Sequence, residues 1–379
     1  TKKMLMSVIT SAQQLPFQGP WPTEDPFLFA VHHNDNFPAG NESMGPTESL
    51  RGRNMGSDFG NKDGWSMYHG ETVPGFPKHP HRGFETVTIA RSGFVDHCDS
   101  LGAAGRFGEG DVQWMTAGKG VSHSEMFPLL NAESRNPAEL FQIWMNLPAR
   151  SKMVDPFFAM LWSENIPKLL SLPGVEVAVV AGQVDGTTPA LPPAAPPDSW
   201  AAQPGSDVGI VTIKLGPGAT WTLPAASSSS TNFKRCLYYF AGGTPCEVGG
   251  QSVPPNMKID LDPTQSVELH NPSTSSAADG AVNSGIGGVG GGVAMEFLLL
   301  EGTPIGEPVV QHGPFVMNDR EGIMQAFEDY QRTQFGGWPW ATDAPVHDRT
   351  RPRFAKFPDG HEETPPPVPG AAMSADVGA

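Results

Sequence analysis

The sequence predicts an all-β fold, a barrel or a sandwich, and two observations support this. The chain of 379 residues contains 44 glycines and 39 prolines, and these turn-forming residues divide it into short segments. The segments between them are β-rich rather than helical. With a hydrophobic content of 38%, the chain can form one large domain or two ordinary ones, each with its own core.

Six segments have the composition of strands and end in glycine or asparagine turns. Several strands at this spacing are typical of a barrel or a sandwich. The loop at residues 146–156 is the best candidate for the connection between two halves. We therefore expect domains at 1–147 and 148–340, followed by a Pro-rich tail at 341–379 that is partly disordered or wraps the surface. The six predicted strands are 84–93, 176–184, 207–216, 234–243, 265–271 and 293–302.

One segment, residues 318–335, predicts a helix instead. Asn318 is the expected N-cap, and Glu321 three residues later completes a capping box. Because the segment follows the last strand, we expect the helix to pack back over the barrel as a strap. The apolar residues that share one face of this helix are Ile323, Met324, Phe327 and Tyr330.

Two low-complexity stretches interrupt the second half. Residues 189–206 are rich in proline and alanine, and residues 271–292 are rich in glycine and serine. Neither stretch can bury enough apolar surface to order itself alone. We expect both to be surface insertions.

Charge and cysteine content exclude several classes of protein. There are 24 Lys and Arg against 40 Asp and Glu, a formal net charge of −16, which disfavours direct binding of nucleic acid. Three irregularly spaced cysteines do not form a disulfide framework or a structural zinc site. No window approaches the roughly 20 apolar residues of a membrane span. We expect a cytoplasmic protein without membrane contact, nuclear if the source is eukaryotic.

The stretch KHPHRGFETVT, residues 78–88, suggests a metal site. His79 and His81 share one face of the predicted strand, because residues i and i+2 point to the same side. The same spacing places Glu85 on that face. His123 and Glu125 form a second pair one residue apart, and two such pairs on two inward-facing strands can surround one point.

A site with three imidazoles and one carboxylate suits a divalent first-row metal and leaves positions for water, substrate or O₂. This chemistry favours iron(II), manganese or copper over a closed zinc site. A lone His-x-His is more often structural than metal-binding, so the prediction depends on both pairs together. The spacing leaves open whether Glu85 or Glu125 is the carboxylate ligand.

Four segments together resemble the pirin family of the cupin superfamily. The resemblance implies a bicupin, two antiparallel jelly-roll-like β-barrels, with one non-haem Fe(II) in the N-terminal barrel and no metal in the C-terminal one. Mn, Cu and Zn are the expected substitutes for iron. The segments are FPAGNESMGP (37–46), HPHRGFETVT (79–88), DSLGAAGRFGEGDVQWMTAGKGVSHSEM (99–126) and GEPVVQHGPFVMN (306–318).

Carried over to this chain, the family's metal ligands are His79, His81, His123 and Glu125. Glu85 then becomes a supporting residue near the metal or the substrate. The resemblance implies a quercetin (flavonol) 2,3-dioxygenase that uses O₂, in which Glu125 or Glu85 takes the hydroxyl proton of a flavonol-like substrate. The alternative is a redox-sensing, iron-dependent cofactor of transcription regulation that binds protein partners without turnover. The candidate substrate contacts are Phe84, Trp114 and Met126.

Overall fold

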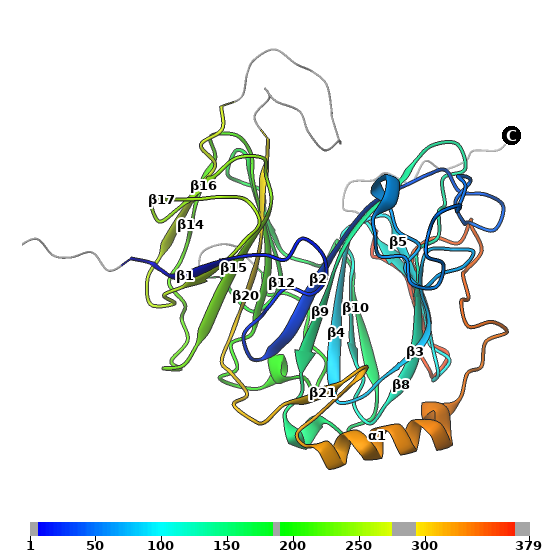
Figure 1. Cartoon of the computed structure of the whole chain (residues 1–379). Helices are drawn as coiled ribbons and strands as arrows, with labels where there is room; N and C mark the ends of the chain where they lie inside the picture. The colour runs from blue at the N-terminus through cyan, green and yellow to red at the C-terminus, as the bar shows by residue number, and fades with distance from the viewer. Residues whose placement is uncertain (1–6, 185–189, 275–292, 368–379) are drawn as a thin grey trace, which may run out of the picture.

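The computed structural model describes residues 7–184, 190–274 and 293–367. It confirms the all-β prediction, with two halves side by side and one α-helix below the first of them (Figure 1). Each half consists of two facing antiparallel sheets. All six predicted strands are present, with ends that differ from the prediction by a few residues.

The first half pairs a five-stranded sheet with a six-stranded one. The five-stranded sheet contains, in spatial order, β10 (Phe157–Leu161), β7 (Val112–Thr116), β4 (Phe84–Ser92), β9 (Asn136–Asn146) and β2 (Phe27–Phe37). The six-stranded sheet contains β24 (Glu362–Glu363), β23 (Phe354–Lys356), β6 (Ala104–Gly108), β5 (Phe94–Asp99), β8 (Val121–Met126) and β3 (Gly75–His81).

The second half pairs a seven-stranded sheet with a four-stranded one. The larger sheet contains β1 (Ile9–Gln14), β18 (Met257–Leu261), β15 (Lys234–Ala241), β20 (Met295–Gly302), β13 (Gly209–Leu215), β12 (Val175–Ala181) and β11 (Lys168–Leu169). The smaller sheet contains β14 (Thr220–Leu223), β19 (Val267–His270), β16 (Cys246–Val248) and β17 (Gln251–Val253).

The five-stranded sheet is buried on both faces, so the side chains of β4 point alternately toward the second half and into the first half. Val87 and Ile89 belong to a core cluster that joins the two halves, together with Ile210 and Tyr238 of the second half. Because side chains alternate along a strand, Thr88 points the other way, and its hydroxyl contacts the Glu125 carboxylate of β8 inside the first half. The odd positions of β4 therefore face the second half, and the even positions face the interior of the first.

Both ends of the chain pair with the half that is distant from them in sequence. β1 pairs with β18 of the second half, and β23 in the predicted tail pairs with β6 of the first half. The buried Arg106 guanidinium binds the Asp96 carboxylate and also donates to the backbone carbonyls of His347, Asp348 and Arg351. Strand pairing thus crosses the expected boundaries near residues 147 and 340.

The predicted helix is α1 (Arg320–Thr333), and it packs on the β21 (Val310–His312) and β22 (Phe315–Met317) hairpin. The predicted N-cap was wrong by one residue, since Asp319 accepts a hydrogen bond from the Gly322 N–H. The Asn318 amide instead donates to Glu307 and to the Pro308 carbonyl. Met324 is exposed, whereas Ile323 is buried, so the packed face is narrower than predicted.

The Pro-rich stretch at 189–206 is not a simple surface insertion, contrary to expectation. In its described part, Ser199 is fully buried and Trp200 packs against the core between the halves. Ser199 precedes the short helix η3 (Trp200–Ala202) and accepts from the Ala201 N–H. The Gly/Ser-rich stretch lies largely outside the described residues. Three other single-turn helices are η1 (Lys62–Gly64), η2 (Ala149–Ser151) and η4 (Gln334–Gly336).

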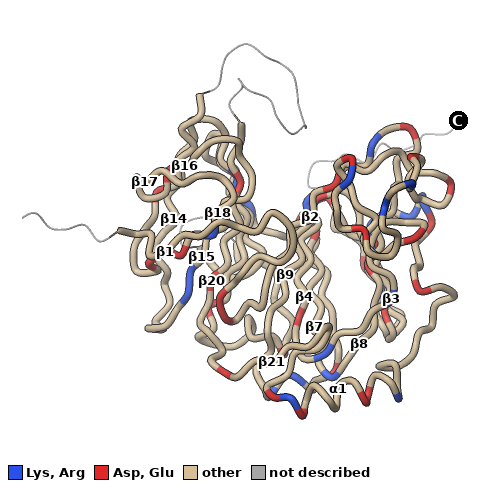
Figure 2. The backbone as a smooth tube through the Cα atoms, viewed as in Figure 1, with Lys and Arg blue, Asp and Glu red and all other residues tan. Residues whose placement is uncertain are grey.

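Charged side chains are distributed over the whole molecule. Figure 2 shows Lys and Arg scattered over both halves and interspersed with Asp and Glu. The helices in the described ranges are all too short or too polar to cross a lipid bilayer.

Candidate metal centre

Three histidine side chains meet between β3 and β8 of the first half. The two strands are antiparallel, and His79 lies directly opposite His123. The ring centroids are 4.7 Å apart for His79 and His81, 4.4 Å for His79 and His123, and 4.9 Å for His81 and His123. One ring nitrogen from each lies within 4.8 Å of the other two, so the three imidazoles can share one ion.

Burial keeps these imidazoles in the neutral form that binds metals. It lowers the pKa of His79 to about 4 and holds the pKa of His81 and of His123 well below the usual value. His79 Nδ1 lies 2.9 Å from the Pro77 carbonyl, which sets its Nε2 as the free ligand atom.

Several of the remaining ring nitrogens are buried without a hydrogen-bond partner. Nδ1 of His81 and both ring nitrogens of His123 have none among the residues that the structure describes. Buried polar atoms without partners are costly, and each needs an explanation. A metal ion would supply a partner to at least one nitrogen of each ring, so the residues present fit such an ion.

Glu125 lies next to this triad on the same face of β8. Its Oε2 is 3.8 Å from His123 Nε2. The Thr88 hydroxyl and the Gln142 amide each lie 3.1 Å from one carboxylate oxygen and orient the group. Burial raises the pKa of Glu125. The carboxylate therefore lies at the edge of the triad, held by two side chains from the opposite sheet.

Glu85 lies elsewhere, and the expectation that it shares the ligand face was wrong. β3 ends at His81 and β4 begins at Phe84 in the other sheet, with Gly83 between them at φ +83°. The period of two does not relate Glu85 to His81, because residues i and i+2 share a face only within one continuous strand. Glu85 points toward the second half, where its carboxyl accepts hydrogen bonds from the Thr116 and Ser199 hydroxyls.

Two of the three histidines, His79 and His81, line a large cavity of about 800 Å³ in the first half. This volume lies within the range of small-molecule sites. Besides His79, His81 and Glu125, it is lined by aromatic side chains from β2, from the segment 59–76 and from β9. The aromatic lining residues are Phe17, Phe29, Phe59, Tyr68, Phe76, Phe127 and Trp144.

Asp35 places a buried carboxyl group in the same cavity wall. It accepts a hydrogen bond from the Tyr68 hydroxyl at 2.6 Å and from the Ser66 N–H at 2.8 Å. Burial outweighs these bonds and raises the pKa of Asp35 to about 7. Asp35 could not be identified from the sequence, because nothing in the spacing of the loop residues shows that they fold back over β2.

The three predicted substrate contacts do not line this cavity. Phe84 stacks on Trp144 at 4.0 Å and contacts the His81 ring at 5.0 Å, so it supports the wall from behind. Trp114 belongs to the core between the halves. Met126 is fully buried and, being next to Glu125 on β8, points to the opposite face. Trp144, which the sequence did not indicate, is the tryptophan that lines the cavity.

Two family models match the chain. A model described as Pirin matches residues 10–145, and one described as Pirin C-terminal cupin domain matches residues 210–336. Together they cover the described sheets of both halves, apart from β10 to β12 between the matches and β23 and β24 in the tail.

Curated relatives and solved structures agree with these matches. The protein named Pirin from Homo sapiens is 35% identical over 279 residues, which cover 71% of this chain and 80% of the relative. A pirin-like protein from Caulobacter vibrioides is 36% identical over 69% of this chain and 80% of its own length. A crystal structure of quercetin 2,3-dioxygenase from Acinetobacter baumannii superposes with a TM-score of 0.64 and 26% identity, covering 87% of this chain and 98% of the other.

Proposed function

Because this chain belongs to the pirin family, we propose that it is a quercetin 2,3-dioxygenase that uses a non-haem metal, Fe(II) in the first instance, and O₂. One observation carries the proposal. Three neutral imidazoles lie close enough to share one ion, and two of them, His79 and His81, form part of the wall of an aromatic cavity of about 800 Å³. The likeness to the Acinetobacter baumannii dioxygenase supports the choice of a flavonol as substrate.

In this proposal His79, His81, His123 and Glu125 hold the metal, and Mn, Cu or Zn are substitutes for iron. When bound, a metal with open positions acts as a Lewis acid toward the oxygens of the flavonol and couples its oxidation to O₂. The protein supplies the neutral imidazoles, a carboxylate and a cavity with largely aromatic walls.

The side chains around the metal would bind the substrate and move its proton. Tyr68, Phe76 and Trp144 offer flat surfaces for the flavonol rings. The raised pKa of Glu125 makes its carboxylate a stronger base than an exposed one, and suits it to accept the flavonol hydroxyl proton. Thr88 and Gln142 keep that carboxylate in place. Glu85 has no part in this step, because it faces the second half.

The test combines metal analysis with anaerobic flavonol titration and O₂ consumption. The iron-loaded protein is expected to shift the absorption spectrum of quercetin without O₂, and to consume O₂ when it is admitted. His81→Ala should lose both, while His312→Ala, an exposed histidine in β21, should keep both. An iron-loaded protein that neither binds quercetin nor consumes O₂ would refute the proposal. Capture of a protein partner that depends on Fe(II) against Fe(III) would instead support the redox-sensing alternative.

We also propose that the protein is cytoplasmic. Cys98, Cys236 and Cys246 are free and buried, which suits a reducing compartment.

A further inference from the structure

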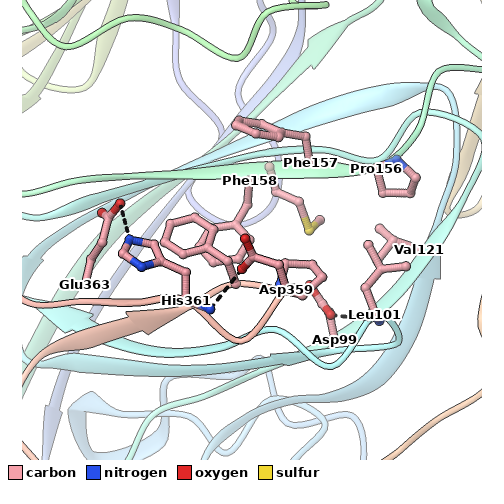
Figure 3. Close-up of a pocket in the computed structure, with 12 residues that line it drawn as sticks. Asp99, Leu101, Val121, Pro156, Phe157, Phe158, Asp359, His361 and Glu363 are labelled. Carbon is pink, nitrogen blue, oxygen red and sulfur yellow. Dashed lines mark hydrogen bonds and ion pairs between the residues drawn. The ribbon is translucent and has the colours of Figure 1, made fainter.

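A second cavity, of about 370 Å³, lies in the first half and is lined on one side by the C-terminal tail (Figure 3). Its walls come from β10, from the beginning of β8 and from tail residues 357–363. Among the described residues it shares no lining side chain with the histidine cavity. The tail residues lie beyond residue 336, where the second family match ends, so this cavity is built partly from a segment that the family models do not include.

The walls of this cavity are mostly apolar and aromatic. The Phe158 and Phe357 rings are parallel, with centroids 4.8 Å apart and an interplanar angle of 6°. Phe157 is 45% exposed and Leu101 is 38% exposed, although both are large apolar side chains. In Figure 3, Phe157 and Pro156 lie on one side of the cavity, and Asp359 and His361 lie on the other. Walls of this kind suit a flat molecule with one or two aromatic rings.

The polar lining of the cavity is negative. Among the described residues that line the cavity, Asp99, Asp359 and Glu363 contribute carboxylates, and none is a lysine or an arginine. Asp99 is buried, and one of its oxygens accepts hydrogen bonds from two backbone N–H groups of the following turn. In the described part of the lining, the one basic side chain is His361, whose Nε2 lies 3.4 Å from the Glu363 carboxylate.

We propose that this cavity binds a small aromatic amine. The ring would pack against Phe157 and Phe357, and the ammonium group would face the carboxylates of Asp359 and Glu363. Charge complementarity decides between ligands of the same shape, because carboxylates at an apolar surface attract a cation and repel an anion. An aromatic carboxylate of equal size should therefore bind more weakly than the amine. The inference does not depend on the activity proposed for the histidine cavity.

Isothermal titration calorimetry of the full chain with 2-phenylethylamine, which is protonated at pH 7, tests the proposal. We expect a Kd of about 1 mM or tighter, with 2-phenylethanol binding about tenfold more weakly and phenylacetate more weakly still. Phe357→Ala, and the double substitution Asp359→Asn with Glu363→Gln, should each weaken amine binding about tenfold. Glu133→Gln removes an exposed carboxylate in another loop and should have no effect.

His81→Ala provides the control for the other cavity. Amine binding that survives His81→Ala and is lost in the Asp359 and Glu363 double variant supports the proposal. Three results would overturn it: no amine binding, equal binding of the amine and of phenylacetate, or binding that is lost in His81→Ala but kept in the double variant. Circular dichroism melting of each variant shows whether a loss of binding reflects unfolding. Failure here leaves the flavonol assay unaffected, since that assay reads a cavity with different lining residues.

Discussion

Replacing Glu85 by glutamine should change how the stability of this protein depends on pH. The Glu85 carboxyl is fully buried between the halves, and burial raises its pKa from 4.5 to about 7 despite hydrogen bonds from the Ser199 and Thr116 hydroxyls. Between these two pH values the folded protein retains a proton that the unfolded chain releases. This contribution to stability is therefore complete below pH 4.5 and is lost as the pH rises through about 7.

The size of the effect follows from the two pKa values. One pKa unit corresponds to about 1.4 kcal/mol, so a rise from 4.5 to about 7 corresponds to about 3 kcal/mol of unfolding free energy. Glu85→Gln removes the titrating group and keeps the shape of the side chain. The wild-type protein should therefore lose about 3 kcal/mol relative to the variant between pH 4.5 and pH 8.

Urea unfolding followed by tryptophan fluorescence, repeated across this pH range, measures the difference. The other buried acids are present in both proteins, so their titrations cancel in the comparison. Glu133→Gln serves as the matched control, because that carboxylate is exposed, and its curve should run parallel to wild type. A Glu85→Gln curve that also runs parallel to wild type would refute the reasoning. Iron content equal to wild type in Glu85→Gln is expected as well, since this side chain faces away from the histidines.

Three further substitutions test the remaining structural arguments. Glu125→Ala should weaken iron binding about tenfold or more, measured by metal analysis after dialysis, and unchanged iron content would exclude it as a ligand. Arg106→Met should lower the free energy of unfolding in urea by about 3–5 kcal/mol, because it leaves the Asp96 carboxylate buried without its charged partner. It should also expose the tail to limited proteolysis. Resistance equal to wild type would contradict the role of Arg106 in holding the tail. Gly83→Ala should lower the free energy of unfolding by about 1–3 kcal/mol or more, because φ is +83° and a Cβ would lie 2.0 Å from the Val316 carbonyl oxygen. An unchanged thermal midpoint of unfolding would contradict this.

The sequence was sufficient for the fold class, for the histidine triad and for the position of Glu125 beside it, but not for the position of Glu85. His79 and His81 lie in one strand, and His123 and Glu125 lie in another, so the period of two applied within each pair. The predicted position of Glu85 was wrong because Gly83 carries the chain from one sheet to the other, and the period of two does not continue through such a turn.

The sequence did not show which side chains line the histidine cavity, and the reason is a different one. β4 and β7 are buried on both faces. Hydrophobicity therefore could not show which face of each strand lines the cavity and which, like the face that carries Trp114, packs against the second half. The true lining residues come from segments that are distant in sequence, such as Asp35, Tyr68 and Trp144. Only tertiary structure brings these segments together.

The exchange of end strands has a consequence for how this protein can be divided. A fragment that ends near residue 147 would lack β10 and β23, the neighbours of β7 and β6, and would expose two unpaired strand edges to aggregation. A fragment of the second half alone would lack β1, the neighbour of β18. The two halves are therefore expected to unfold in one cooperative transition, although the family models describe them as separate units. Recombining halves between relatives would succeed only if both end strands were transferred with the sheets they complete.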